Sequence, residues 1–411
     1  MSLSRVWCFA AVVWLSAAPA FALPPALPRS DDPAVQAFLS NDLERALPML
    51  LKSARQSPMD ADAHAWLASC QRRLGQYDDA ERSARRALAL DPRHAFAHQV
   101  LGDTYNPVYS GWEHTDAESS WTHLRLSVAG DPNFGDAWAG LWIPAMQRGD
   151  SALEKQSLRS LVSTGFLTPG MLAYSRWVLR SLPERAAIVC NGDMDTYPLV
   201  ALQETEGLRT DVVVLNVGLL DLPWYRRLMH ARHGLPMPTE DDLAPGQTAD
   251  GGNVTSYQKL LGAWVDTVAT GRFGRPFTTA VTLTVDSFLP GHPRRDVLAG
   301  PFWEHPPGPI ESGVDTARAR ASLQRIDRAA AAQTYVAAGD HSPLRRVFTN
   351  DMHDNIANVA RLYVAEVRKT KDEARVQAAL VWARQLALET GASAALLRGF
   401  QPHGADEGGK E

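Results

Sequence analysis

The spacing of apolar and polar residues changes twice along the chain, and each spacing predicts a different kind of element. From residue 33 to residue 182, small and apolar residues recur every three or four positions, as on one face of an α-helix. Residues 183–310 instead hold short apolar runs between polar loops, which is typical of buried strands. Helical spacing returns in residues 311–400. The chain therefore predicts a mixed fold of helical repeats, an α/β domain and a C-terminal helical pair.

The first helical segment repeats itself at a fixed distance. Each of six residues corresponds to one found 34 positions earlier: Gly75, Tyr77, Ala80, Ala84, Ala87 and Pro92 correspond to Asn41, Leu43, Ala46, Leu50, Ser53 and Pro58. The glycine predicts a turn, and the three alanines share a helical face where a neighbouring helix can approach closely. This pattern resembles the tetratricopeptide repeat, a helix-turn-helix unit of the same length.

The number of repeats follows from how far the pattern continues. It is strongest from Ala61 to Pro92, weaker from Pro33 to Pro58, and begins again at Ala95. The third copy is interrupted by Asn106-Pro107 and an aromatic stretch, and a fourth pair is expected from Gly135 to Leu161. Four tryptophans lie in this region, Trp112, Trp121, Trp138 and Trp142, and we interpret most of them as repeat core rather than as an exposed binding platform. Stacked repeats present a concave face that holds an extended peptide or a helix, so we expect a protein or peptide partner there. The alternative is that this face packs against the rest of the chain.

The N-terminal residues predict the compartment. Residues 1–22 combine a basic start at Arg5, an apolar stretch, and the small-residue ending Ala20-Phe21-Ala22, which is typical of a cleaved secretory signal peptide. We expect the mature protein to begin near Leu23, to lie in the periplasm or outside the cell, and to have no membrane span after cleavage. The remaining cysteines, Cys70 and Cys190, are interpreted as buried apolar residues rather than a disulfide.

A strand, loop, helix and strand follow one another after Pro183. The apolar run Ala186–Cys190 precedes a polar loop and a helical stretch that ends at Gly207, and the second run is Val212–Asn216. Right-handed crossover makes this a parallel βαβ unit, so residues 183–310 predict a Rossmann-like domain. Residues 277–285 and 296–303 predict further strands.

The stretch Asn191–Leu199, together with Arg209, Asn216 and Pro223-Trp224-Tyr225, carries a resemblance to a known family. It resembles the soluble domain of bacterial membrane proteins similar to protein O-mannosyltransferases. The resemblance implies a shared fold and a shared pocket. This chain lacks the many spanning helices of those larger proteins, so their transferase activity is not carried over.

Ligands of open α/β sheets bind at the carboxyl ends of the strands, and polar residues gather there in this sequence. We take five residues as the candidate ligand-binding set: Asn191, Asp193, Asp195, Thr196 and Asn216. The two carboxylates suit a hard cation or a hydroxyl-rich ligand. The alternative is that they only cap the helix. Because Pro198 is suited to a first helical turn, we expect Asp195 near the cap and Asp193 facing the crevice.

The C-terminal residues predict a helical pair followed by a disordered tail over 401–411. One helix would present Ala357, Ala360 and Val364, the other Ala374, Ala378, Val381 and Leu388. Residues 350–355 are polar and predict a helix start.

Charge and motif content narrow the function classes. The net charge is −5 without long runs of like charge, so a nucleic-acid partner is not expected. No phosphate-binding loop, zinc-protease pair or nucleophile elbow occurs, so the sequence names no reaction, cofactor or metal. Three hypotheses remain. The first is an envelope protein that binds partners through its repeats, the second a glycan- or nucleotide-sugar-related enzyme or accessory protein acting at Asp193 and Asp195, and the third a purely structural module.

Overall fold

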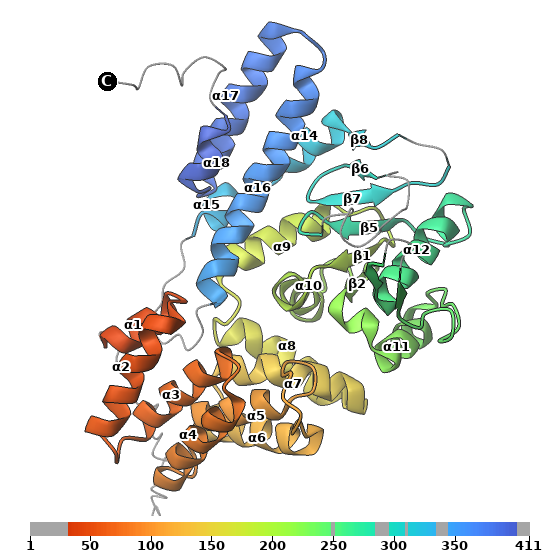
Figure 1. The fold of residues 1–411 in the computed structure, drawn as a ribbon. Helices are drawn as coiled ribbons and strands as arrows, with labels where there is room; N and C mark the ends of the chain where they lie inside the picture. The colour runs from red at the N-terminus through yellow and green to blue at the C-terminus, as the bar shows by residue number, and fades with distance from the viewer. Residues whose placement is uncertain (1–31, 248–250, 284–295, 309–310, 334–343, 401–411) are drawn as a thin grey trace, which may run out of the picture.

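The structure is a computed structural model that describes residues 32–247, 251–283, 296–308, 311–333 and 344–400 (Figure 1). The predicted signal peptide and the predicted C-terminal tail lie outside these residues. The division into separate domains at residues 182 and 310 stays a prediction.

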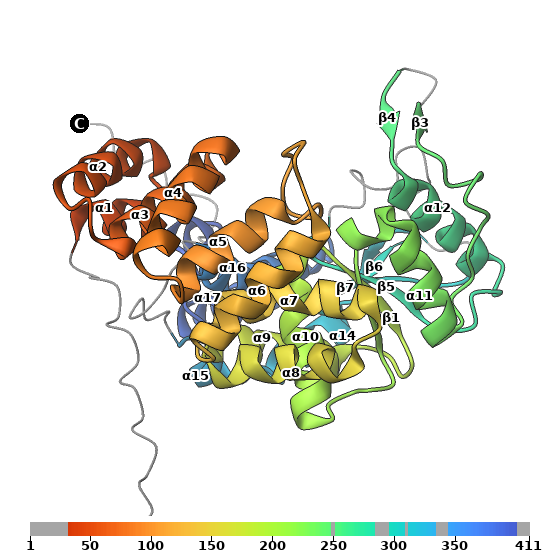
Figure 2. The same cartoon turned by 90° about the horizontal axis from the view of Figure 1, so that it is seen from below.

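Four antiparallel helix pairs stack one after another in the N-terminal part, as the repeat pattern predicts (Figures 1 and 2). They are α1 (Pro33–Leu39) with α2 (Leu43–Gln56), α3 (Ala61–Arg73) with α4 (Tyr77–Leu90), α5 (Ala95–Tyr105) with α6 (Ala117–Gly130), and α7 (Gly135–Arg148) with α8 (Ser151–Ser163). The expected interruption of the third pair is residues 106–116, which separate α5 from α6. Ala80 and Ala84 are fully buried, which confirms the predicted packing face.

Aromatic side chains connect successive pairs. Edge-to-face contacts join Phe38 to Trp66, Trp66 to Phe96 and Phe96 to Phe134, with 5.4, 4.8 and 6.0 Å between ring centroids. Such contacts stabilise beyond simple burial, so each pair supports the next. Trp138 and Trp142 are buried as expected, whereas Trp112 and Trp121 are only half-buried.

A six-stranded sheet forms the centre of the α/β region, with strand order β2-β1-β5-β7-β6-β8. The strands are β1 (Ala187–Cys190), β2 (Val213–Asn216), β5 (Phe277–Ala280), β6 (Val297–Leu298), β7 (Phe302–His305) and β8 (Gly313–Val314), and a separate two-stranded ribbon consists of β3 (Gly246–Gln247) and β4 (Asn253–Val254). β1 pairs parallel with both β2 and β5, and α10 (Asp193–Glu206) connects β1 to β2, which confirms the βαβ unit. The run 296–303 is not one strand, because a turn separates β6 from β7 and lets them pair antiparallel.

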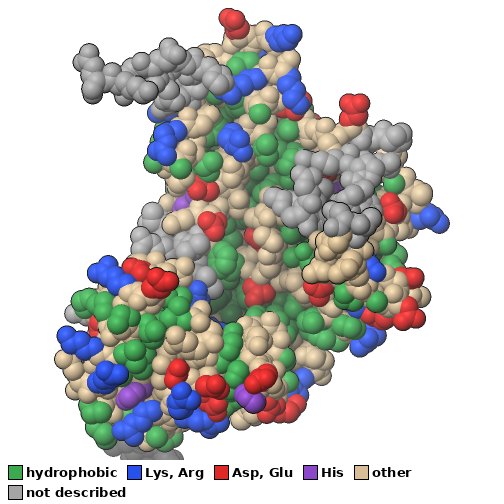
Figure 3. Space-filling view, in the orientation of Figure 1, with side chains coloured by type: hydrophobic (Ala, Val, Ile, Leu, Met, Phe, Trp, Pro, Cys, Tyr) green, Lys and Arg blue, Asp and Glu red, His purple; other side chains and the backbone are tan. Residues whose placement is uncertain are grey.

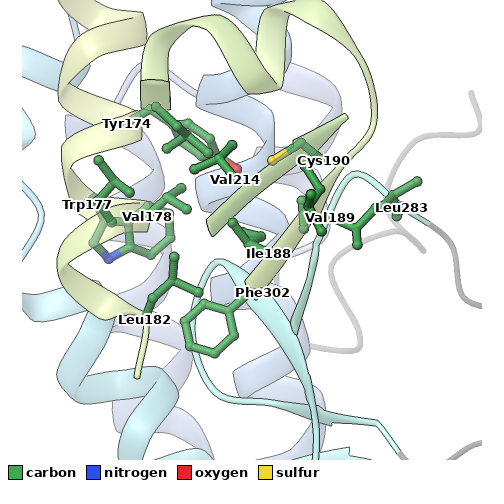
Figure 4. Packing of buried hydrophobic residues seen from close by; sticks show 14 of the residues in the cluster. Tyr174, Trp177, Val178, Leu182, Ile188, Val189, Cys190, Val214, Leu283 and Phe302 are labelled. Atoms are coloured by element: carbon green, nitrogen blue, oxygen red, sulfur yellow. The ribbon is translucent and has the colours of Figure 1, made fainter. Parts of the chain in front are cut away.

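Helices cover the sheet. η1 (Gly218–Asp221), α11 (Pro223–His233) and α12 (Ser256–Ala269) lie beyond β2 in the chain. α9 (Pro169–Ser181) follows the repeats, and its side chains Trp177 and Val178 lie against Ile188 of β1 and Phe302 of β7 (Figure 4). One buried cluster runs from Leu124 in the repeats through the sheet to the C-terminal helices. The repeats and the α/β region therefore share part of their core.

The C-terminal part is helical, as expected, but two details of the prediction are wrong. It contains α14 (Thr316–Gln324), α15 (Arg328–Ala331), the packed pair α16 (Leu344–Arg368) and α17 (Glu373–Glu389), and α18 (Ala394–Arg398). Residues 350–355 lie inside α16 rather than at its start. On α17, Val381 and Leu388 are 62% and 46% exposed, because α16 instead covers the face that carries Leu380 and Ala383.

Two further expectations concern cysteines and the membrane. Cys70 and Cys190 are both free and buried, which confirms that they are not bridged. Over the residues that the structure describes, no helix is both long enough and apolar enough to cross a bilayer.

The repeats contain a histidine pair that predicts acid sensitivity. Nδ1 of His98 lies 2.9 Å from Nδ1 of His123. Burial, with the nearby His98 and Arg85, lowers the pKa of His123 to about 4, and Glu81 opposes this shift. The unfolded chain would take up that proton near pH 6.5, so the stability is fully present above pH 6.5 and is lost as the pH falls toward 4.

We therefore expect a His123→Gln variant to lose less unfolding free energy than the parent protein between pH 7 and pH 5. Glutamine keeps a hydrogen-bonding group but does not titrate. Urea unfolding at both pH values measures the difference, and His114→Gln at an exposed site is the control. Equal losses in the parent and His123→Gln would contradict the prediction.

Candidate functional site

A cavity of about 790 Å³ lies between the concave face of the repeats and the carboxyl ends of β1, β2 and β5. Figure 3 shows the surface hollowed between the repeats and the rest of the molecule. Side chains from α3, α5, α7, α10 and α16 line it together with the loop between α5 and α6. The concave face and the strand-end loop, which the sequence offers as two separate binding places, therefore belong to one cavity.

The loop after β1 is shaped by Gly192. Its φ of 129° lies in a region that favours glycine, and it lets the chain turn directly from the strand into α10. The helix begins at Asp193, so the prediction that Pro198 occupies its first turn is wrong. Both aspartates lie in the first helical turn, where a carboxylate interacts favourably with the helix dipole.

Asp193 faces the cavity and is held by neutral donors. The side-chain amide of Asn216 donates to its Oδ1 at 3.0 Å. The hydroxyls of Tyr109 and Tyr197, 2.8 Å apart, also hydrogen-bond with the Asp193 carboxyl. Burial raises the pKa of Asp193, and these hydrogen bonds partly oppose the shift.

Asp195 lies beside it but has a different environment. Its Oδ2 accepts the backbone N–H of Asn191 at 3.2 Å and a hydrogen bond from the Thr282 hydroxyl. Asn191 in turn donates its side-chain amide to the Thr282 carbonyl at 3.1 Å. Burial raises the pKa of Asp195. These contacts join the β1 loop to the segment after β5, so Asp195 stabilises the edge of the cavity.

Four of the five predicted site residues line the cavity: Asn191, Asp193, Asp195 and Asn216. Thr196 does not. Its hydroxyl donates to the carbonyl of Gly192 at 2.7 Å and its side chain is fully buried. The structure therefore places Thr196 behind the loop.

Several lining residues escaped the sequence analysis, and most come from the repeats. Asp103 on α5 accepts Gln99 Nε2 at 2.6 Å and lies 3.4 Å from the Arg72 guanidinium. Burial raises the pKa of Asp103 to about 6. Tyr109 comes from the interruption of the third repeat, whose departure from the 34-residue pattern is the signal that could have identified it. α16 adds Asp351, which no local pattern indicates.

A resident metal ion receives no support from the geometry. No group of three or more histidine, cysteine, aspartate or glutamate side chains within the described ranges is arranged to hold one. The cavity combines carboxylates, amides, hydroxyls and two arginines. Such a set can bind and orient a polar ligand.

Comparison with known proteins bears on both halves of the cavity. Residues 61–94 match the family model of the tetratricopeptide repeat. The chain therefore contains a tetratricopeptide repeat. Residues 171–264 match the model of TMEM260-associated domain 2. The matched residues include α10 and the β1 loop.

Two solved structures, titled as crystal structures of MamA and of MamA protein, are similar to this chain at 15% identity and a TM-score of 0.26 each. They cover 49% and 50% of this chain and 96% and 94% of their own. A comparison with curated proteins found no match.

Proposed function

We propose that this protein is an exported tetratricopeptide-repeat protein that binds a segment of a protein partner in the cavity between its repeats and its α/β region. One observation carries the proposal: Asp103 on the concave face and Asp193 at the start of α10 line the same cavity. A segment bound to the repeats would therefore also contact the α/β region. The tetratricopeptide match supports a protein partner as the ligand class.

Export is the second part of the proposal, and it rests on residues 1–22. Amino-terminal sequencing of the protein recovered from the periplasm or the medium should give a start near Leu23. An intact Met1 would contradict the proposal that the signal is cleaved.

A glycan-containing ligand is the second candidate. It is supported by the resemblance of residues around Asn191 to the soluble domain of O-mannosyltransferase-like membrane proteins. The hydroxyl and amide groups around Asp193, from Tyr109 and Asn216, also suit a hydroxyl-rich ligand. Specific binding of a sugar, with no bound protein segment, would favour this candidate.

Site-specific photo-crosslinking in cells tests partner binding. A photoreactive residue at Val108, which lines the cavity and is 36% exposed, should give a discrete adduct with a partner. The same residue at Leu126, which is 45% exposed and lies outside the cavity lining, should give none.

Filling the cavity provides the blocking control. We expect Ala139→Trp, whose new side chain would occupy the cavity wall, to abolish the Val108 adduct while far-UV circular dichroism stays unchanged. No adduct at Val108 in a folded, exported protein would contradict the proposal and favour a purely structural module.

A further inference from the structure

The acidic residues that line the cavity outnumber the basic ones, and the basic ones lie on a single helix. Five aspartates and two arginines line the cavity: Asp103, Asp136, Asp193, Asp195 and Asp351, with Arg72 and Arg73. Both arginines lie on α3, at the repeat side of the cavity. Arg72 pairs with Asp103 at 3.4 Å, so one aspartate is already compensated. The cavity as a whole has an excess of carboxylates.

Asp193 lacks a cationic partner. Its hydrogen bonds come from an amide and two phenols, and no lysine, arginine or histidine in the described part of the chain forms an ion pair with it. A carboxylate shielded from water without a full counter-charge is costly, and the dipole of α10 and the neutral donors offset that cost only in part. A cation from a ligand would offset it further.

Other carboxylates of the cavity add to the negative charge around Asp103. The charges of Asp136 and Asp193 both raise the pKa of Asp103, so the three groups lie within electrostatic range of one another. Two arginines already act on Asp103 from α3. Asp193 and Asp195, by contrast, belong to α10, and no arginine that lines the cavity comes from that helix.

The cavity walls limit what kind of cation fits. Its volume of about 790 Å³ exceeds that of a single ion, and the residues lack a metal-binding arrangement. Val108, Leu219, Phe348 and Met352 add apolar surface to the lining. The side chains of lysine and arginine combine a charged end with an apolar stem. Such a side chain matches a cavity that is lined by both carboxylates and apolar residues.

We propose, on the basis of the proposed function, that the partner segment inserts a lysine or arginine side chain into the cavity and that its charged end pairs with Asp193. The apolar stem packs against the walls. The rest of the segment lies along the concave face of the repeats.

Isothermal titration calorimetry with model peptides tests this pairing. The probe is acetyl-Ala-Ala-Lys-Ala-Ala-amide, and the same peptide with norleucine is its neutral control of nearly equal shape. We expect the lysine peptide to bind at least tenfold more tightly. We also expect Asp193→Asn to remove that tenfold preference, whereas Glu373→Gln, a matched change at an exposed site on α17, should keep it.

A second readout needs no variant. Because burial raises the pKa of Asp193, a cation bound beside this carboxyl should lower that pKa, and protons should be released over the pH range in which the carboxyl titrates. Titrations at a series of pH values, each in two buffers with different ionisation enthalpies, count the released protons. The lysine peptide should release protons and the norleucine peptide should not.

The outcomes separate this inference from the function on which it rests. Equal affinity of the two peptides, or no proton release, would overturn the inference even if the Val108 adduct forms. Loss of that adduct would instead contradict partner binding itself. Binding of mannose in place of either peptide would overturn the inference and favour the glycan candidate.

Discussion

Ala84→Glu is expected to unfold the repeats at temperatures where the parent protein is stable. Ala84 is fully buried on α4 and belongs to the hydrophobic cluster of the first repeats. A glutamate there would place a charge among apolar side chains, with a loss of about 3–5 kcal/mol, as for other uncompensated buried charges. Thermal unfolding followed by circular dichroism measures the effect.

The matched control is Ala89→Glu, the same substitution at an exposed position of the same helix. We expect its unfolding free energy to stay within about 0.5 kcal/mol of the parent, as for most surface changes. Similar unfolding of the two variants would show that the register of the repeat is wrong.

Arg209→Ala should cause the second-largest loss of stability. The Arg209 guanidinium donates to the carbonyls of Leu179, Leu182 and Pro183 at 2.7–2.9 Å, and it also pairs with Asp211. It thereby holds the end of α9 next to the start of β1. Removing it leaves three carbonyls without this donor, and we expect a loss of about 2–3 kcal/mol.

Chemical denaturation of Arg209→Ala and Arg209→Lys measures this effect. Lysine keeps the charge but cannot span all three carbonyls, so its loss should be intermediate. Arg227→Ala, at an exposed position on α11, is the control for removing an arginine. A loss at Arg209 no greater than at Arg227 would contradict the structural role of the network.

The local patterns identified most elements, because a helical face or a buried strand is a periodic feature of a few neighbouring residues. The spacing of Ala80 and Ala84 gave the correct packing face. The expected face on α17 was wrong at Val381 and Leu388, because its exposure depends on where α16 packs. The start of α10 was also misplaced, since Gly192 turns the chain earlier than Pro198 suggests.

The candidate site was only partly accessible from sequence. Asp193 and Asn216 could be paired in advance, because they lie at the carboxyl ends of adjacent parallel strands, which meet at one edge of the sheet. Thr196 could not be distinguished from them on sequence alone. The packing of α10 decides which side of its first turn faces the cavity.

The sequence by itself determined the repeat length, the parallel βαβ unit and the polar loop at its strand end, since each depends on residues close together in the chain. Only the tertiary structure decided that the concave face closes over that loop. The contact between Tyr109 and Tyr197 joins residues 88 positions apart, and Asp351 comes from still farther along the chain. Such contacts depend on the complementary shapes of whole elements, and no local spacing of residues records them.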